Sequence, residues 1–290
     1  MTALACEYSR YRTRWILAMT ALCLMQTPRI ACADQCAAGS VFPDTPMYAV
    51  GSFPNAVAMG DFDHDGNLDV AVANGGSNEV TILRNDGDGI MVSFSTVPTG
   101  PTPIGLAQAD LDADGDLDLL TTNREIGGVT LLINDGTGAM TPLILTDIAS
   151  DPLAAVAGDF DGDGKVDIAI SNGDSHEVTI LKRQGDLEYV FDATIGVGAF
   201  PISITACDLD DDGDVDLATA NRFGNSVSIL INDGAGQFNS LPPIATGDGP
   251  FSIDAADIDG DGNLDLMTTN RSSDDISFIR RNAAGDFASF

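Results

Sequence analysis

The sequence is short of several residue types, and each shortage narrows the classes of protein to which it can belong. Only 13 of its 290 residues are Lys or Arg, against 44 Asp or Glu, which gives a formal net charge of −31. A surface of this sign repels phosphate backbones and anionic lipids, so nucleic acid and membrane surfaces are excluded as partners. For the two histidines, His64 and His176, the sequence indicates no arrangement with a Ser or Cys that is typical of a catalytic pair. No nucleophile and base pair is therefore predicted.

Long apolar runs are also missing, apart from one near the N-terminus. Arg10, Arg12 and Arg14 precede the apolar residues 15–25, and the small residues 31–33 follow. This order is typical of a secretory signal peptide, and the run is too short to span a bilayer. We expect residues 1–33 to be removed and the rest to be secreted, into the medium or the periplasm. An N-terminal helix buried in the fold is the alternative.

The part after the leader has 9 cationic against 43 anionic side chains, a net charge of −34. Such acidity can accompany disorder, but 44% of the chain is hydrophobic and can build a core. Two cysteines remain, Cys36 and Cys207. They can form one disulfide in an exported protein, or Cys207 can be a buried free thiol. Two cysteines do not make a disulfide scaffold.

One nine-residue pattern occurs five times at a constant interval of 49 residues. The copies are DFDHDGNLD from Asp61, DLDADGDLD from Asp110, DFDGDGKVD from Asp159, DLDDDGDVD from Asp208 and DIDGDGNLD from Asp257. A fixed period of this length indicates a repeat architecture in which each unit is one supersecondary element. We place the units at 53–101, 102–150, 151–199, 200–248 and 249–290.

Each unit is predicted to contain four short strands. In the first unit they cover residues 56–60, 68–73, 80–84 and 91–97, with the Asp-rich loop between the first two. An Asn ends the second strand of every unit, and Asn85-Asp86-Gly87 is a hairpin signal. Four strands in about 49 residues is the length of one propeller blade. The fold predicted is all-β, a β-propeller of five four-stranded blades.

The fourth strand of the last unit is cut short at Phe290. A shift of 49 positions back from residues 92–99, in the fourth strand of the first unit, leads to residues 43–50 within the segment 41–52, and the following Gly51 corresponds to Gly100. We expect them to complete the last blade and to close the ring, which would remove exposed sheet edges. An open arc, or a ring completed by another subunit, is the alternative.

Each loop carries Asp at positions 1, 3, 5 and 9 and Gly at position 6. Oxygen ligands on a tight turn suit Ca²⁺, which takes six to eight of them. Without a cation, four neighbouring carboxylates would repel one another. An EF-hand is excluded because position 12, where it needs Glu, holds Val, Ile or Thr. The sequence predicts about five structural Ca²⁺ ions.

These loops resemble the calcium loops of FG-GAP, or VCBS-type, repeats, the blades of the integrin α-subunit propeller. The segment Asn232-Asp233-Gly234-Ala235-Gly236-Gln237-Phe238 resembles the turn after the third strand in bacterial members. The resemblance implies carboxylate ligands at positions 1, 3, 5 and 9, and a carbonyl ligand at position 7. Integrin-type propellers have seven blades, whereas five are counted in this chain.

The implied carboxylate ligands are Asp61, Asp63, Asp65, Asp69, Asp110, Asp112, Asp114, Asp118, Asp159, Asp161, Asp163, Asp167, Asp208, Asp210, Asp212, Asp216, Asp257, Asp259, Asp261 and Asp265. The implied carbonyl donors are Asn67, Asp116, Lys165, Asp214 and Asn263.

The function expected is an extracellular protein-interaction or adhesion scaffold, monomeric, without catalytic residues. A lectin is the alternative, although after the leader there is no Trp and only Tyr48 and Tyr189 to stack on sugars. An accessory domain of an extracellular hydrolase is a second alternative. The loops between second and third strands form the expected recognition face. Their Arg124, Arg222 and Arg271 either bind a ligand carboxylate or balance nearby Asp.

Overall fold

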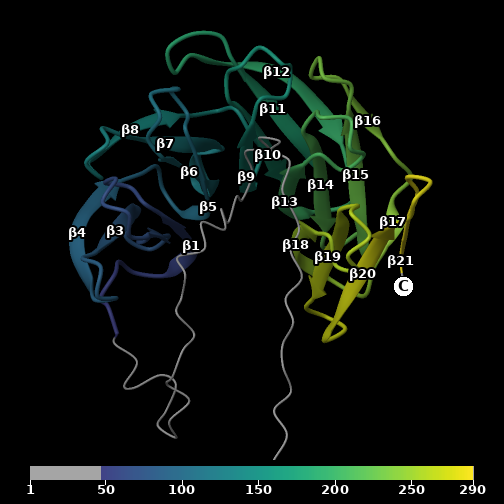
Figure 1. Ribbon diagram of the computed structural model, residues 1–290, viewed down its shortest axis with the longest axis horizontal. Helices are drawn as coiled ribbons and strands as arrows, with labels where there is room; N and C mark the ends of the chain where they lie inside the picture. The colour runs from purple at the N-terminus through teal and green to yellow at the C-terminus, as the bar shows by residue number, and fades with distance from the viewer. Residues whose placement is uncertain (1–46, 290) are drawn as a thin grey trace, which may run out of the picture.

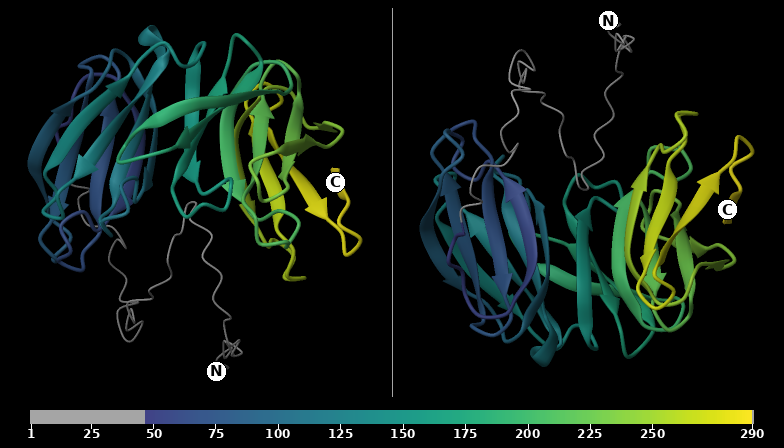
Figure 2. Two further views of the ribbon diagram at one scale, coloured as in Figure 1. Left: turned by 90° about the horizontal axis from the view of Figure 1, so that it is seen from above. Right: turned by 90° about the horizontal axis from the view of Figure 1, so that it is seen from below.

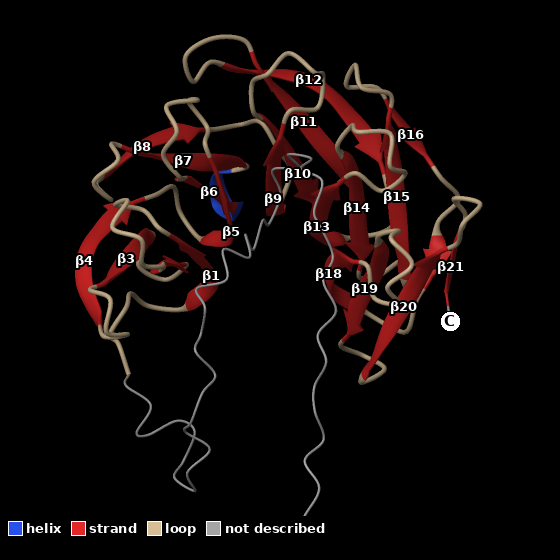
Figure 3. Ribbon diagram, viewed as in Figure 1, coloured by secondary structure: helices blue, strands red, loops and turns tan. Residues whose placement is uncertain are grey.

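The computed structural model describes residues 47–289, and they form five antiparallel sheets arranged around a common axis (Figures 1 and 3). In every sheet the strands pair in chain order, and the first strand lies nearest the axis. The all-β propeller of four-stranded blades predicted from the repeat is confirmed. The strand ends fall within two residues of those predicted for the first unit.

The strands of the first three sheets have the following bounds. The first sheet contains β1 (Pro54–Gly60), β2 (Asp69–Asn74), β3 (Glu79–Asn85) and β4 (Met91–Pro98). The second contains β5 (Pro103–Ala109), β6 (Asp118–Asn123), β7 (Gly128–Asn134) and β8 (Met140–Leu145), with the 3₁₀ turn η1 (Arg124–Ile126) between β6 and β7. The third contains β9 (Pro152–Gly158), β10 (Asp167–Asn172), β11 (Glu177–Arg183) and β12 (Tyr189–Gly196).

The last two sheets differ slightly at their outer edges. The fourth contains β13 (Pro201–Cys207), β14 (Asp216–Asn221) and β15 (Ser226–Asn232), with β16 (Phe238–Ser240) and β17 (Ile244–Ala245) both paired to β15. The fifth contains β18 (Pro250–Ala256), β19 (Asp265–Asn270), β20 (Asp275–Arg281) and β21 (Phe287–Ser289). Among the described residues, no helix has the length and apolar character that crossing a membrane requires.

The hydrophobic core lies between neighbouring blades, in four clusters. The middle strands are buried on both faces: every residue of β6 and β10 is buried, including their Thr, Ser, Asp and Asn side chains. The residue at loop position 2 fills each interface. Its copies Phe62, Leu111, Phe160 and Leu209 are at most 1% exposed. The Asp loops are therefore attached directly to the packed core.

The five blades form an open arc, with the first and fifth blades at its two ends (Figures 1 and 2). No strand pairing joins these two blades within residues 47–289. Side chains that are buried in the interior blades are consequently exposed at the ends. Ile258, the fifth copy of loop position 2, is 46% exposed, and Met59 on β1 is 60% exposed. The curvature of this arc leaves one inter-blade interface unmade.

The segment predicted to close the ring, residues 41–52, lies partly outside the described residues, and the predicted leader 1–33 lies wholly outside them. Residues 47–53 are described and form no strand. The hydroxyl of Tyr48 accepts a hydrogen bond from the backbone N–H of Met91 in the first blade, at 3.1 Å. The fourth strand of the last blade begins with β21, which pairs with the end of β20. Completion of that blade by residues 41–52 stays a prediction.

Candidate metal centres and the central cavity

Each Asp loop connects the innermost strand of a blade to the second strand, and it brings three carboxylates together. Positions 1, 3 and 9 each offer an oxygen within 4.8 Å of the other two. The five groups are Asp61, Asp63 and Asp69; Asp110, Asp112 and Asp118; Asp159, Asp161 and Asp167; Asp208, Asp210 and Asp216; and Asp257, Asp259 and Asp265. The structure thus gathers three of the four carboxylates expected from each loop.

The ninth Asp is the deepest member and also holds the blade together. Asp118 is fully buried. One of its oxygens accepts the N–H of Leu111 and the other the N–H of Asn134, both at 2.7 Å. The same two contacts, seven residues back and sixteen residues ahead, occur in all five units. This carboxylate therefore ties the loop to the third strand. In the sequence, the only indication that this Asp also connects the loop to the third strand is its constant position at the start of the second strand.

The first Asp closes the turn of the loop. In the second unit, Asp110 accepts the N–H of Asp114 and that of Gly115, each at 3.1 Å. Gly115 has φ of 98°, in the left-handed region where a side chain is disfavoured. The Gly required at position 6 is confirmed in this conformation in all five loops.

Positions 5 and 7 are placed differently. Asp114 lies outside the three-carboxylate cluster and accepts the N–H of Asp116 at 2.9 Å. The same contact, from residue 7 to the carboxylate of residue 5, is made in every loop. Coordination by the fifth-position carboxylates and the seventh-position carbonyls stays a prediction.

Burial makes these clusters electrostatically unfavourable by themselves. It raises the pKa of Asp118 and Asp216 to about 7 and that of Asp167 to about 6, in spite of the two backbone N–H donors on each. Neighbouring loop carboxylates raise these pKa values further. A hard divalent cation with oxygen ligands would relieve both effects. The donor set therefore fits Ca²⁺.

The five clusters fall into two classes according to the residue that precedes the last position of the third strand. In the odd-numbered blades it is cationic and contacts the third-position Asp. Arg84 lies 2.6 Å from Asp63, Lys182 lies 3.4 Å from Asp161, and Arg280 is paired with Asp259. In the second and fourth blades the same position is Ile133 or Ile231. Two clusters are thus left without a cation paired to their carboxylates.

A cation from the next blade does approach these two loops, but it binds their backbone. Arg183 donates to the carbonyl of Asp112 at 2.8 Å. Arg281 donates to the carbonyl of Asp210 at 2.7 Å and to the exposed carboxylate of Asp211. These arginines link successive blades without an ion pair to the clustered carboxylates.

The remaining polar residues singled out from the sequence are placed as follows. His64 contacts Asp116 in the next loop at 2.5 Å, which raises its pKa. His176 lies on the opposite face, where its Nδ1 is 3.1 Å from the N–H of Phe200. Cys207 is a free thiol whose pKa burial raises to about 12. Cys36 lies outside the described residues.

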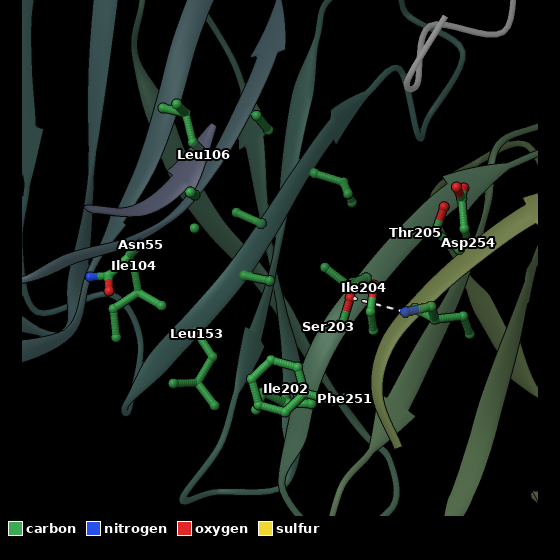
Figure 4. Close-up of a pocket in the computed structure, with 18 of the residues that line it drawn as sticks. Asn55, Ile104, Leu106, Leu153, Ile202, Ser203, Ile204, Thr205, Phe251 and Asp254 are labelled. Carbon is green, nitrogen blue, oxygen red and sulfur yellow. Dashed lines mark hydrogen bonds between the residues drawn. The ribbon is translucent and has the colours of Figure 1, made fainter. Parts of the chain in front are cut away.

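The innermost strands surround a cavity of about 910 Å³ along the axis (Figure 4). One ring of its lining consists of the second residue of each innermost strand, and four of the five are apolar. They are Asn55, Ile104, Leu153, Ile202 and Phe251. Asp254 is the single carboxylate among the lining residues, which include no His or Cys. The cavity is therefore mainly apolar.

Arg124, Arg222 and Arg271 lie at one end of this cavity, on the loops that follow the second strands. Strand order places these loops on the face opposite the Asp loops. Arg124 is paired with Asp151, as expected if it only balances a nearby carboxylate. Arg222 and Arg271 have no such partner among the described residues. Both instead lie against the ring of Phe251, at 5.8 and 5.3 Å from its centre.

Solved structures share the architecture at low sequence identity. A candidate 6-phosphogluconolactonase of Bacteroides uniformis matches with a TM-score of 0.62 and 18% identity, over 82% of this chain and 70% of the other. A protein of Lactobacillus plantarum gives the same values. A lectin of Agrocybe aegerita that recognises non-reducing terminal N-acetylglucosamine matches with a TM-score of 0.54 and 17% identity, over 81% of this chain and 64% of the other. These likenesses concern the fold alone.

Sequence comparison identifies the repeat itself. No curated protein matches the chain. The model of the FG-GAP-like repeat matches four times, over residues 61–121, 110–170, 159–219 and 208–268. These matches start at the Asp loops of the first four blades and together extend into the fifth. The chain therefore belongs to the family of FG-GAP-like repeat proteins.

Proposed function

We propose that this protein is a secreted, calcium-binding β-propeller that acts as an extracellular protein-interaction or adhesion scaffold and not as an enzyme. The observation that carries the proposal is the fivefold recurrence of one cluster of three carboxylates at the same place in every blade. In this proposal Ca²⁺ supplies positive charge and coordination to the loops, and it catalyses nothing.

The residues of the loops explain why a bound cation would stabilise the fold. The ninth Asp connects the loop to the third strand through two backbone N–H groups, and the loop residue at position 2 fills the interface with the next blade. Repulsion among the three carboxylates acts against both contacts. A ligand that binds only the folded loops raises stability in proportion to the logarithm of its concentration.

The cavity supports binding in preference to hydrolysis. A glycosidase needs a pair of carboxyl groups about 5 to 10 Å apart, whereas Asp254 is the single carboxylate among the described lining residues. The clustered Asp residues are held by backbone N–H groups within their own loops. The opposite face, with unpaired cations and aromatic rings, has the composition of a recognition surface.

The test is to express the full chain with its own leader and to analyse the exported product by native mass spectrometry. We expect an N-terminus at Asp34, five bound Ca²⁺ ions, and a fall in melting temperature on chelation. An exported product without bound calcium, and without a change in melting, would contradict calcium binding. Retention of residues 1–33 would contradict secretion by this leader. A glycan-array signal that survives Asp-to-Asn changes in the loops would favour a lectin.

A further inference from the structure

Two of the nine Lys and Arg side chains in the described residues lack a polar partner, whereas the other seven bind a carboxylate or a backbone carbonyl. Residues 47–289 contain nine Lys and Arg. Six of them are paired with carboxylates, and Arg183 donates to two backbone carbonyls. Arg222 and Arg271 make neither an ion pair nor a side-chain hydrogen bond within the described residues. In a chain with a net charge of −31, an unpaired guanidinium is unusual, and these two share one location.

Both guanidinium groups lie at the same end of the central cavity, on neighbouring blades. Arg222 follows β14 and Arg271 follows β19. Both lie near the ring of Phe251, at the start of β18, at 5.8 and 5.3 Å from its centre. Phe251 is 40% exposed, so part of its side chain is accessible to a ligand. Figure 4 shows Phe251 and Ile202 among the residues that line the cavity.

A pair of further aromatic rings extends the surface. The rings of Phe200 and Phe223 pack against each other at a tilt of 40°, with ring centres 4.7 Å apart, and the guanidinium of Arg222 lies 5.3 Å from the centre of the Phe223 ring. Phe200 has φ of 60°, a left-handed conformation that is costly for a bulky residue. The equivalent residue in the fifth blade is Gly249, which adopts this conformation freely. The equivalent residues Phe53, Thr102 and Asp151 adopt the same conformation, so this turn is a feature of every blade, and in the fourth blade it presents an aromatic ring.

The other three blades lack this combination. The positions equivalent to Arg222 and Arg271 are Gly75 and Gly173 in the first and third blades. In the second blade the position is Arg124, whose charge is already used by Asp151. The cationic and aromatic surface is therefore confined to the fourth and fifth blades.

We infer that this surface binds an organic anion, a carboxylate carried on an apolar body, with the carboxylate between Arg222 and Arg271 and the apolar part over Phe251 and into the cavity. Two guanidinium groups offer forked N–H donors to a carboxylate. The adjacent lining, Ile202 and Leu153, is apolar and gives few partners for hydroxyl groups. An apolar body is therefore favoured over a sugar. The inference rests on the proposed binding function and names its ligand class.

The experiment is a calorimetric titration of the exported chain with biphenyl-4-carboxylate in the presence of calcium. Biphenyl-4-carboxamide has the same shape without the charge, and glucuronate has the charge on a hydroxylated ring. We expect binding of the first compound alone. Arg222→Ala and Arg271→Ala should each weaken it by about tenfold to a hundredfold, the usual cost of a hydrogen bond to a charged group. Phe251→Ser should weaken it as well.

Arg124→Ala is the matched control, because it removes an arginine from the same repeat position that is already paired. It should leave the affinity unchanged. Equal binding of the carboxamide, or equal losses in all three arginine variants, would overturn the inference. So would tighter binding of glucuronate, or no binding by a protein that retains its calcium and its melting temperature. Bound calcium and melting are measured on every variant. Failure of the calcium proposal is thereby distinguished from failure of the anion site.

Discussion

The alternation of a cationic residue (Arg84, Lys182 and Arg280) with Ile133 and Ile231 predicts that the five carboxylate clusters differ in their affinity for Ca²⁺. A cation on the third strand already neutralises part of the first, third and fifth clusters, and it would repel a metal ion bound there. Two unit charges 4 Å apart interact by about 4 kcal/mol at the effective dielectric constant of a protein surface. Lys182 lies 3.4 Å from Asp161 and is 20% exposed, so screening reduces this value.

We take about 2 kcal/mol as the net effect, which corresponds to roughly thirtyfold in Kd. The protein should then have two tighter sites, at the loops that begin with Asp110 and Asp208, and three weaker ones. Lys182→Ile should add a third tight site, because it reproduces the environment of the second and fourth blades. Ile231→Lys should remove one, since it places a cation beside Asp210.

The assay is a calcium titration in competition with a chromophoric chelator, which counts the sites in each affinity class. The two variants exchange equivalent residues of neighbouring blades, so each is the reciprocal control of the other. Melting curves at saturating calcium show that both remain folded. Five sites of equal affinity, or a site count that neither substitution changes, would refute the electrostatic reasoning.

Further predictions concern the core and the clusters. Leu209→Ala should cost about 2 to 5 kcal/mol in urea denaturation, because Leu209 is fully buried, whereas Ile258→Ala should cost less than half as much, because Ile258 is 46% exposed. An equal cost would show that the last blade is covered in solution. In the calcium-free protein, Asp118 and Asp216 have folded pKa values near 7, above their unfolded values. Their stabilisation is therefore present at low pH and is lost as pH rises through 7. Melting in chelator should be higher at pH 5.5 than at pH 8, and Asp118→Asn should reduce this difference. A melting temperature in chelator that rises with pH would contradict the burial argument.

Much of the architecture could be predicted because the same pattern of strands and loops occurs five times in the sequence. Periodicity located the strands, and the spacing of Asp and Gly located the loops. The structural roles of individual residues were harder to predict from the sequence. From the sequence, Asn74 is only a residue that ends a strand, yet it is fully buried and its side chain donates a hydrogen bond to the hydroxyl of Thr81 at 2.9 Å. Asn172 makes the same link to Thr179 at 2.8 Å. Such contacts join strands at a separation that local turn chemistry does not reveal.

The number of blades that a ring needs is a property of packing and not of the repeat. The angle between two neighbouring blades depends on the volume of the side chains packed between them, such as Leu209 and Phe160. The constant interval of 49 residues determines the strands and loops within one blade, but it does not determine the angle between blades. The effect of replacing Lys182 by Ile231 at the same repeat position could not be predicted for a related reason. The alternation has a period of two blades, and its effect depends on which Asp the side chain contacts in the folded blade.

The carboxylate clusters and the surface around Arg222 and Arg271 lie at opposite ends of the innermost strands. This separation determines how strongly a ligand at one end can influence binding at the other. β13 starts beside Phe200 and ends beside Asp208 after seven residues, which is roughly 23 Å at about 3.3 Å per residue. The Debye length at physiological ionic strength is about 8 Å. Charge on a bound Ca²⁺ ion is therefore screened before it reaches Arg222. Calcium should change the affinity for an organic anion only by keeping the blades folded. At a temperature where the calcium-free protein stays folded, titration in 0.15 M salt should give the same Kd, within about twofold, with and without calcium. A larger change would mean that the loops alter the geometry at the far end of the strands, and the two ends would then be coupled through the packing of the blades.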